Sequence, residues 1–158
     1  MKILMVCLGN ICRSPLAEGI MRDKIQREGI DVTVDSAGTA DYHTGEPPDK
    51  RSQEVAQKHG IDISKQRART FQIADFDRFD RIYVMDRNNY NDLAVLARDK
   101  QDMQKLDLIL NTLHPGKNKE VPDPYYGGIN GFENVYQMLD ASCNKVLQTV
   151  LTNNDETA

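Results

Sequence analysis

The sequence predicts an α/β fold in which a parallel sheet carries helices on both of its faces. Two observations predict this class. Apolar runs of strand length alternate with segments of helical spacing, and the first run, KILMVCL at 2–8, lacks the polar alternation of a half-exposed strand. The length of 158 residues and the hydrophobic content of 39% are typical of one globular domain with a full-sized core.

Each element follows from its local pattern. The predicted strands are 2–8, 30–38 with its end at Asp35–Ser36, 79–86 and 105–110. The predicted helices are 13–28, 50–60, 89–100 and 132–151, and two loops rich in turn residues lie at 39–49 and 114–131. Pro15 suits the first turn of a helix that begins near Arg13–Ser14, and Gly29 and Gly60 suit the ends of the first two helices.

The last predicted helix is amphipathic. Its apolar face consists of Phe132, Val135, Met138, Leu139, Cys143, Val146, Leu147 and Val150. We therefore expect this face, with Cys143, to be part of the core. The polar tail at 152–158 is expected to be frayed.

Composition narrows the function. The net charge of −4, without a basic tail or stripe, argues against nucleic acid as a partner. The N-terminal apolar run is too short for a signal peptide and no run approaches membrane-spanning length, so we expect a cytoplasmic protein that does not bind membranes. In that compartment the three cysteines should stay reduced, and their odd number argues against a disulfide framework.

The stretch VCLGNICRSP at 6–15 joins the first strand to the first helix. Ligands of open α/β sheets bind at the carboxyl ends of the strands, where Cys7 lies. Backbone N–H groups in such a loop, together with a helix N-terminus, form an anion-binding nest, and Arg13 adds a planar fork that matches two phosphate oxygens. The same field favours a thiolate at Cys7. Ser14 is suited to orient the sulfur, and Asn10 to brace the loop.

Other interpretations of this loop have less support. A zinc site is disfavoured because His43, His59 and His114 are scattered without ligand spacing. The loop also lacks the G-x-G-x-x-G pattern of dinucleotide-binding folds and the Walker pattern of nucleotide-binding loops. The remaining alternative is that Cys7 and Cys12 are small buried hydrophobic residues beside a tight turn.

A second candidate is the stretch EVPDPYYGG at 120–128. A thiolate that attacks phosphorus must expel an alkoxide or phenoxide, which needs a proton. Asp123 lies between two prolines, which stiffen its backbone, and Tyr125 and Tyr126 offer flat apolar walls for an aromatic ring. Taken alone, the stretch could equally be a turn followed by two packed tyrosines, but its pairing with the cysteine loop favours an acid.

Four other polar residues are weaker candidates. Tyr42 could be a further wall of a substrate cleft, and Ser36 could brace the cysteine loop from the end of the second strand. Arg67 and Arg69 could attract an anionic substrate, although charged clusters are usually solvated surface.

Taken together, these motifs resemble the low-molecular-weight protein tyrosine phosphatases. CLGNICRS at 7–14 and DPYYGG at 123–128 carry the resemblance, and DSAGT and MDRNN support it over nearly the whole chain. It implies a small Rossmann-like domain with a central four-stranded parallel sheet. One departure is visible, because Lys65 and Gln66 stand in a segment where several members carry a histidine.

The resemblance also implies roles for single residues. Cys7 would be the nucleophile, Arg13 would bind the phosphoryl group, and Asp123 would be the general acid and then the general base. The phosphate-binding loop would add Leu8, Gly9, Asn10, Ile11, Cys12 and Ser14, and the substrate cleft Tyr42, Tyr125 and Tyr126. Cys12 matches the family's second cysteine, which can form a reversible disulfide with the nucleophile. Neither a metal nor a cofactor is implied.

The predicted function is therefore hydrolysis of phosphotyrosine in proteins through a phosphocysteine, by a monomer or weak oligomer. One alternative is an arsenate reductase on the same fold, but that chemistry relays a disulfide outward and only Cys143 remains outside the loop. A protein arginine phosphatase is a second alternative. The branched Ile11 bears on this choice, because it restricts the mouth of the loop. A phosphopeptide-binding module without turnover is a third, and the presence of both Cys7 and Asp123 argues against it.

Overall fold

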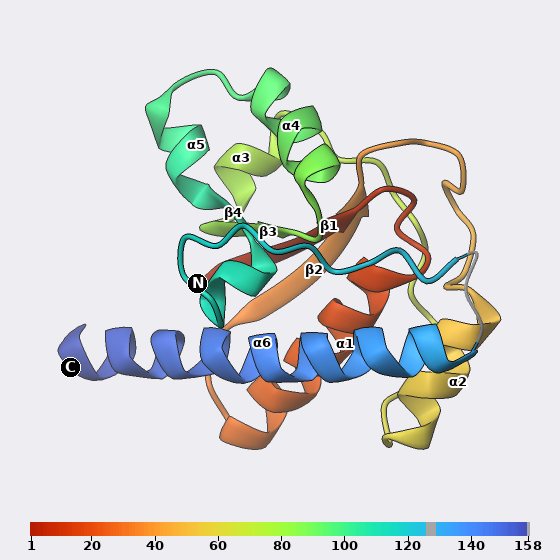
Figure 1. The fold of residues 1–158 in the computed structure, drawn as a ribbon. Coiled ribbons are helices and arrows are strands. Elements are labelled where there is room, and N and C mark those ends of the chain that lie inside the picture. Colours follow the sequence, from red (N-terminus) through yellow and green to blue (C-terminus); the bar gives the residue numbers. More distant parts are fainter. Residues whose placement is uncertain (126–128, 158) are drawn as a thin grey trace.

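The computed structural model describes residues 1–125 and 129–157 and contains a four-stranded sheet whose strands all run parallel, in the order β2-β1-β3-β4 (Figure 1). The strands are β1 (Lys2–Cys7), β2 (Thr33–Gly38), β3 (Arg81–Val84) and β4 (Leu106–Leu108). This architecture confirms the predicted fold class.

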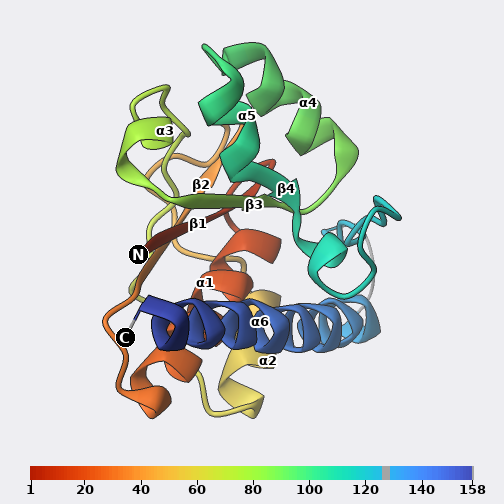
Figure 2. The ribbon, with the colours of Figure 1, turned by 90° about the vertical axis from the view of Figure 1, so that its left-hand side faces the viewer.

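Helices cover both faces of the sheet. They are α1 (Arg13–Glu28), α2 (Lys50–Lys58), α3 (Asp75–Arg78), α4 (Arg87–Leu96), α5 (Lys100–Lys105) and α6 (Ile129–Thr157), with a 3₁₀ turn η1 at Ile109–Thr112. With the sheet seen on edge, α3, α4 and α5 lie on one side and α1, α2 and α6 on the other (Figure 2). Among the described residues, none of these helices combines the length and apolarity needed to cross a membrane.

The central strand β1 explains why the first apolar run shows no alternation. Ile3 and Met5 point to the cluster under α1 and α6, whereas Leu4 and Val6 point to the cluster under α3 and α4. All four are fully buried, so each side chain of the strand faces a hydrophobic core. Cys7 ends the strand on the α1 side.

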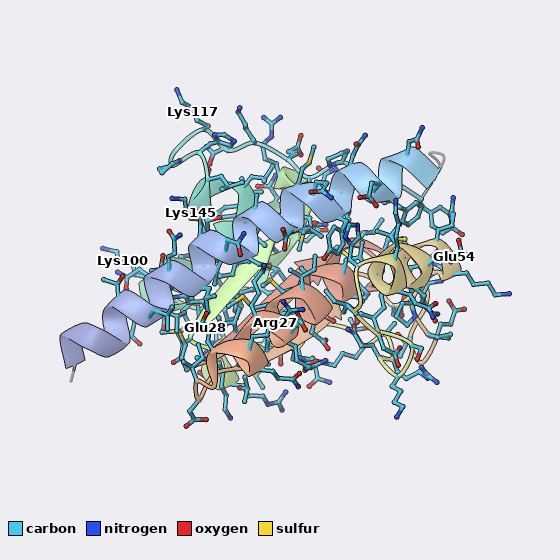
Figure 3. All side chains as sticks on the ribbon, turned by 90° about the horizontal axis from the view of Figure 1, so that it is seen from below. Arg27, Glu28, Glu54, Lys100, Lys117 and Lys145 are labelled. Atoms are coloured by element: carbon cyan, nitrogen blue, oxygen red, sulfur yellow. The ribbon has the colours of Figure 1, made fainter. Side chains whose placement is uncertain are left out.

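The long helix α6 packs lengthwise along α1, as the view from below shows (Figure 3). Its predicted apolar face is confirmed, since its members are buried or packed against the core and Cys143 is fully buried. Charged side chains such as Glu28 on α1, Glu54 on α2 and Lys145 on α6 are exposed (Figure 3). The helices α1 and α6 are also joined by an ion pair between Lys24 and Asp140, at 2.8 Å.

The first predicted helix has the expected ends, and the second ends at Lys58, just before the predicted Gly60, whose backbone is left-handed with φ 81°. Pro15 lies in the first turn of α1, and Gly29 caps that helix with a left-handed backbone, φ 62°, while its N–H donates to Gln26. Asp49 caps the start of α2 by accepting a hydrogen bond from the N–H of Arg51.

Several bounds differ from the prediction. The predicted helix 89–100 is α4, which begins at Arg87 and ends at Leu96, and Lys100 begins α5. β2 continues beyond Ser36 to Gly38, because it stays paired with β1 to the end of that strand. The region around 105–110 is a strand of three residues followed by the 3₁₀ turn. The tail at 152–158 was expected to be frayed, but α6 extends to Thr157, and this part of the sequence has no glycine or proline to stop the helix.

The helices α3 and α5 were not predicted. They have four and six residues, which is too short for a helical hydrophobic period to show. Both are fixed by carboxylates: Asp75 accepts from the N–H of Gln72 before α3, and Asp99 caps α5 by accepting from Asp102.

Candidate active site

A cleft of about 280 Å³ opens at the carboxyl end of β1, as expected for this class of sheet. Its walls come from three separate loops, which follow β1, follow β2 and precede α6. The lining residues are Cys7, Leu8, Gly9, Ile11, Cys12, Arg13, Tyr42, His43, Asp123 and Tyr125. The fold therefore brings the predicted nucleophile, arginine and acid to one cavity.

The loop after β1 turns its carbonyl groups away from the cleft. Those of Cys7, Leu8 and Ile11 accept hydrogen bonds from the N–H groups of Thr39, Ala40 and Asp49 at 2.9, 3.0 and 2.8 Å. Within the described part of the chain, the N–H groups of residues 8–13 donate to no other group of the protein. These donors at a helix N-terminus remain available to an anion, which is the nest that the sequence predicts.

Asn10 lies at the turning point of this loop, where its backbone is left-handed with φ 58°. Asparagine tolerates this conformation better than other residues with a side chain. Its amide Nδ2 donates to Ser14 Oγ at 2.8 Å and to Ser36 Oγ at 2.9 Å, and its Oδ1 accepts from the N–H of Arg69 at 3.0 Å. The amide is buried, and both of its N–H bonds and its oxygen are engaged, as expected if Asn10 and Ser36 brace the loop.

The thiol of Cys7 lies 3.0 Å from Ser14 Oγ. Because Ser14 already accepts from Asn10, its single proton is available to the sulfur. Both side chains are buried, so the hydrogen bond is shielded from water. Ser14 is therefore placed to stabilise a negative sulfur.

A buried carboxyl supports this network from behind. Ser36 donates to Glu18 Oε1 at 2.8 Å, and Glu18 Oε2 pairs with Arg22 at 2.6 Å. Burial raises the pKa of Glu18, although the hydrogen bond from Ser36 and the charge of Arg22 oppose that shift. Glu18 was not singled out from the sequence, because a lone glutamate in a helix carries no signal of burial.

Arg13 is held in place by groups that are distant in the sequence. Its Nη1 donates to Asp86 Oδ2 at 2.7 Å and to the carbonyl of Val121 at 2.9 Å, and its side chain is only 3% exposed. Burial alone would lower the pKa of Arg13, but the charges of Cys7 and Asp86 outweigh it and raise this pKa. Arg13 therefore stays charged at the base of the cleft.

Asp86, which orients Arg13, also caps α4. One of its oxygens accepts from the N–H of Asn89 at 2.8 Å while the other accepts from Arg13. Sequence reasoning noted the segment MDRNN only as a family feature and gave Asp86 no role. A capping pattern was visible there, but the contact with Arg13 arises only in the fold.

Asp123 lines the cleft and belongs to the segment between η1 and α6, which crosses in front of the sheet (Figure 1). Its Oδ2 lies 3.8 Å from Arg13 Nη2, and its side chain is 41% exposed. Its Oδ1 accepts from the N–H of Tyr125 at 3.0 Å, which fixes the carboxyl in a local turn. The predicted acid thus faces both the arginine and solvent.

Arg51 fastens this acid loop to α2. Its Nη2 donates to the carbonyl of Tyr125 at 2.9 Å, and its guanidinium lies over the rings of Tyr125 and Phe132, 5.6 and 4.6 Å from their centroids. Asp49 accepts two further hydrogen bonds from the same guanidinium. Arg51 was not predicted, because nothing in its local sequence points to a loop 74 residues away.

Aromatic rings form the outer walls of the cleft. Tyr42 is 73% exposed and Tyr125 is half-buried, in agreement with their predicted places, while Tyr126 lies outside the described residues. His43 also lines the cleft, which the sequence analysis missed. Its Nδ1 lies 2.6 Å from Glu46 Oε2, and its ring is so close to Gly9 that a Cβ there would come within 3.0 Å.

Cys12 is buried within the same loop. Burial is the main cause that raises its pKa to about 12, and the charge of Asp49 adds to the effect. Cys12 is therefore a protonated thiol under neutral conditions and a poor nucleophile. Cys7, Cys12 and Cys143 are all free thiols in this structure.

The two other predicted arginines lie elsewhere. Arg67 donates to the carbonyls of Ser64 and Gln66, and Arg69 pairs with Asp35 and Asp75, so neither lines the cleft. The expectation that Arg69 draws a substrate is wrong, because two carboxylates neutralise its charge. Gln66, at the family's histidine segment, donates instead to the carbonyl of Pro15 at 3.1 Å. Among residues 1–125 and 129–157, no group of three or more metal-binding side chains occurs.

Comparison with known proteins agrees with this geometry. A family model for the low molecular weight phosphotyrosine protein phosphatases matches residues 2–156. The phosphatase of that name from Schizosaccharomyces pombe is 41% identical over 147 residues, which cover 90% of this chain and 93% of the relative.

Solved structures give the same result. A protein tyrosine phosphatase from Entamoeba histolytica has a TM-score of 0.90 at 38% identity, covering 98% of this chain and 99% of that one. A Drosophila arginine phosphatase has a TM-score of 0.88 at 32% identity, covering 95% and 98%. The family resemblance seen in the sequence is confirmed: this chain belongs to the low-molecular-weight protein tyrosine phosphatases, which are phosphoric monoester hydrolases.

Proposed function

We propose that this chain hydrolyses phosphotyrosine in proteins through a phosphocysteine on Cys7, with Arg13 binding the phosphoryl group and Asp123 transferring protons. One observation carries the proposal. The Cys7 thiol, the Arg13 guanidinium and the Asp123 carboxyl line a single cleft, at a loop whose N–H groups have no other partner among the described residues. Such a site can hold a phosphate dianion and stabilise the charge that develops on it.

In the first step the Cys7 thiolate attacks phosphorus and the bond to the phenolic oxygen breaks. Asp123 enters protonated and gives its proton to the departing oxygen, so that the tyrosine leaves neutral. The N–H groups of the loop and Arg13 bind the equatorial oxygens throughout. The exposure of Asp123 on the outer side of the cleft suits a leaving group that departs towards solvent.

In the second step water attacks the phosphocysteine. The Asp123 carboxylate, left by the first step, takes a proton from this water, and the phosphorus–sulfur bond breaks to release inorganic phosphate. The sulfur must leave as a thiolate. Ser14, 3.0 Å from the sulfur, donates to it at this point and so helps both steps.

The walls of the cleft favour an aromatic ester. Tyr42 and Tyr125 both line the cleft, and their flat rings can pack against a phenyl ring. We propose Leu8, Gly9, Ile11 and Cys12 as the remainder of the phosphate-binding loop. Tyr126 stays part of the proposed cleft on the sequence pattern alone.

A protein arginine phosphatase is the second candidate, supported by the likeness to the Drosophila enzyme. An arsenate reductase has less support. Its disulfide relay would need a third accessible thiol, whereas Cys143 is fully buried, donates to the carbonyl of Ala17, and has a pKa that burial raises to about 12.

The same proposal covers the redox behaviour of the loop. Peroxide oxidises the Cys7 thiolate to a sulfenic acid. Cys12 then loses its proton and attacks the Cys7 sulfur, which forms a disulfide and releases the sulfenic oxygen as water, and the raised pKa of Cys12 makes this second step slow. Peroxide inactivation should therefore reverse with added thiol in the wild type and far less in Cys12→Ser.

We further propose one cytoplasmic phosphatase domain over residues 1–158, working without a cofactor as a monomer or weak oligomer.

Replacing Cys7 by serine tests the function. We expect Cys7→Ser to fold and bind inorganic phosphate but to release no phenol from an aryl phosphate. Cys143→Ala is the matched control, because it removes a thiol outside the cleft, and it should turn over normally. Normal turnover by Cys7→Ser would contradict the proposal. Phosphotyrosine and phosphoarginine peptides of equal sequence, assayed in parallel for phosphate release, decide between the two candidate substrates.

A further inference from the structure

An ion-pair cluster around a buried carboxylate lies behind the phosphate-binding loop and outside the cleft. Its centre is Asp75, at the start of α3, whose side chain is 0% exposed. Asp75 accepts from Arg69 Nη1 at 3.0 Å and Nη2 at 3.3 Å, from Arg78 at 3.3 Å, and from the N–H of Gln72 at 2.8 Å. The mechanism above uses none of these groups.

The burial of the Asp75 carboxylate needs an explanation. Taking this charge out of water costs free energy that the attraction of its arginine partners offsets only with good geometry, so an ion pair with a buried member is weak evidence of a stabilising device. Such pairs can instead be retained because they fix one local conformation. The conformation that Asp75 fixes is that of Arg69, its main partner.

The backbone of Arg69 joins the end of β2 to the phosphate-binding loop. Its carbonyl accepts from the N–H of Gly38 at the end of β2, at 2.8 Å, and its N–H donates to Asn10 Oδ1 at 3.0 Å. The side chain of Arg69 is held from the other direction by Asp75 and, at 3.3 Å, by Asp35. Arg69 is thus clamped at both ends, and the N–H that touches Asn10 has a fixed position.

This N–H decides which way the Asn10 amide faces. With Oδ1 bound to Arg69, the NH₂ group must point to Ser14, which it reaches at 2.8 Å. Ser14 then accepts from Asn10 and keeps its proton for the sulfur of Cys7. If the amide turned over, Oδ1 would face Ser14, the hydroxyl would donate to it, and the sulfur would lose its hydrogen bond.

We infer that Asp75 and Arg69 are positioning residues of the phosphatase reaction: by holding the Arg69 N–H against Asn10, they direct the Ser14 proton to Cys7. The inference rests on the proposed function, because it concerns the reactivity of the same thiol. Neither residue touches the substrate, and their effect passes through Asn10 to the nucleophile.

Asp75→Asn tests this inference, and Asp102→Asn is its matched control. Asp102 is also a buried carboxylate held by an arginine, with Arg98 Nε at 2.9 Å and Nη2 at 3.1 Å, but it belongs to α5 and has no contact with the loop. Both substitutions swap one carboxylate oxygen for an amide nitrogen beside a guanidinium. Both should lower the unfolding temperature.

The two variants should differ in reactivity. We expect kcat for an aryl phosphate to fall roughly tenfold in Asp75→Asn with KM changed by less than about twofold, since misplaced catalytic groups cost rate rather than binding. Alkylation of Cys7 by iodoacetamide at fixed pH should slow in the same variant, because it reports the nucleophilicity of the thiol. Asp102→Asn should leave kcat and alkylation at wild-type values.

A double-mutant cycle shows whether the effect passes through Asn10. In an Asn10→Ala background the amide is gone, so adding Asp75→Asn should lower kcat no further. Equal and independent losses in both backgrounds would overturn the inference, as would a kcat of Asp75→Asn equal to that of Asp102→Asn. If Asp75→Asn does not fold, Arg69→Met and Arg69→Lys replace it: the first should show the loss and the second, which keeps a cation beside Asp75, should recover most of it.

The wild-type activity distinguishes a failure of the proposed function from a failure of the inference about Asp75 and Arg69. Absence of Cys7-dependent turnover in the wild type would end the proposed function, and the present inference with it. Wild-type turnover combined with unchanged kcat in Asp75→Asn and Arg69→Met would end only the inference.

Discussion

The two sides of the cleft are built differently. On the nucleophile side, Cys7, Asn10 and Ser14 are buried and joined by hydrogen bonds that continue to Ser36 and Glu18. On the acid side, Asp123 is 41% exposed and its loop is held at a few points. The groups proposed to bind the phosphate, which is common to all substrates, are therefore preorganised, whereas those proposed to meet the variable leaving group are more exposed.

Variants on the two sides should therefore differ in their kinetics. Substitutions on the nucleophile side should slow the hydrolysis of every phosphate ester by a similar factor, because the phosphoryl group is common to all. Damage to the acid side should depend on the leaving group, because only a poor leaving group needs the proton.

The largest effect is expected for Arg13→Lys. Lysine keeps the charge but loses the planar fork that donates to Asp86 and that, in the proposed mechanism, also binds the phosphoryl oxygens. We expect kcat/KM to fall by roughly 10³-fold, similar for activated and unactivated aryl phosphates. The control is Arg27→Lys on the exposed side of α1, which should have wild-type kinetics. A loss that varies strongly with the leaving group would contradict the division between the two sides.

Asp123→Ala should have the next largest effect, and it should be selective. We expect kcat to fall roughly 10²-fold for an unactivated aryl phosphate and much less for a nitrophenyl ester, whose phenol leaves without a proton. Steady-state rates over a series of phenols of rising acidity check this expectation. A uniform loss across the series would mean that Asp123 acts on binding rather than on the leaving group.

Arg51→Ala should resemble a weak form of Asp123→Ala. The guanidinium donates to the Tyr125 carbonyl and stacks on its ring, so its loss frees the loop that carries the acid. We expect a loss of roughly threefold to tenfold in kcat, larger for poor leaving groups. Arg87→Ala is the control, because the Arg87 side chain binds the same loop through an exposed pair with Glu120, which is worth little, and the backbone hydrogen bond of Arg87 to Glu120 is kept.

The smallest effect concerns Cys12. With its pKa raised to about 12, roughly one Cys12 thiol in 10⁴ is ionised at about pH 8, four units below that value. The folded state suppresses the thiolate until pH rises towards 12, so iodoacetamide should label Cys7 and leave Cys12 intact between about pH 6 and pH 8. Peptide mapping by mass spectrometry measures this directly. Equal labelling of both cysteines would show that the loop opens readily.

Much of the nucleophile side could be predicted from sequence, because its signals are local. Cys7, Arg13 and Ser14 lie within eight residues at a strand–helix junction, and Pro15 marks where the helix begins. The long helix α6 was equally readable from its apolar face. The groups that orient these residues were not, since Asp86 lies 73 residues from Arg13 and Arg69 lies 59 residues from Asn10.

The missed contacts share a physical cause. A carboxylate or histidine has no hydrophobic period, so sequence patterning does not show whether it is buried, as Asp75 and Glu18 are, or lines a cleft, as His43 does. The two short helices escaped for a related reason. Their caps are visible as single aspartates, but four to six residues give no periodic signal.

The hydrogen bond from Arg13 to the carbonyl of Val121, across 108 residues, has a consequence for the order in which the enzyme comes into being. The thiol loop is synthesised first, whereas the Val121 carbonyl that helps to hold Arg13 and the proposed acid Asp123 are both made after β4. A nascent chain that has emerged from the ribosome only as far as β4 therefore carries Cys7 without these two partners. We expect such a nascent chain to lack phosphatase activity.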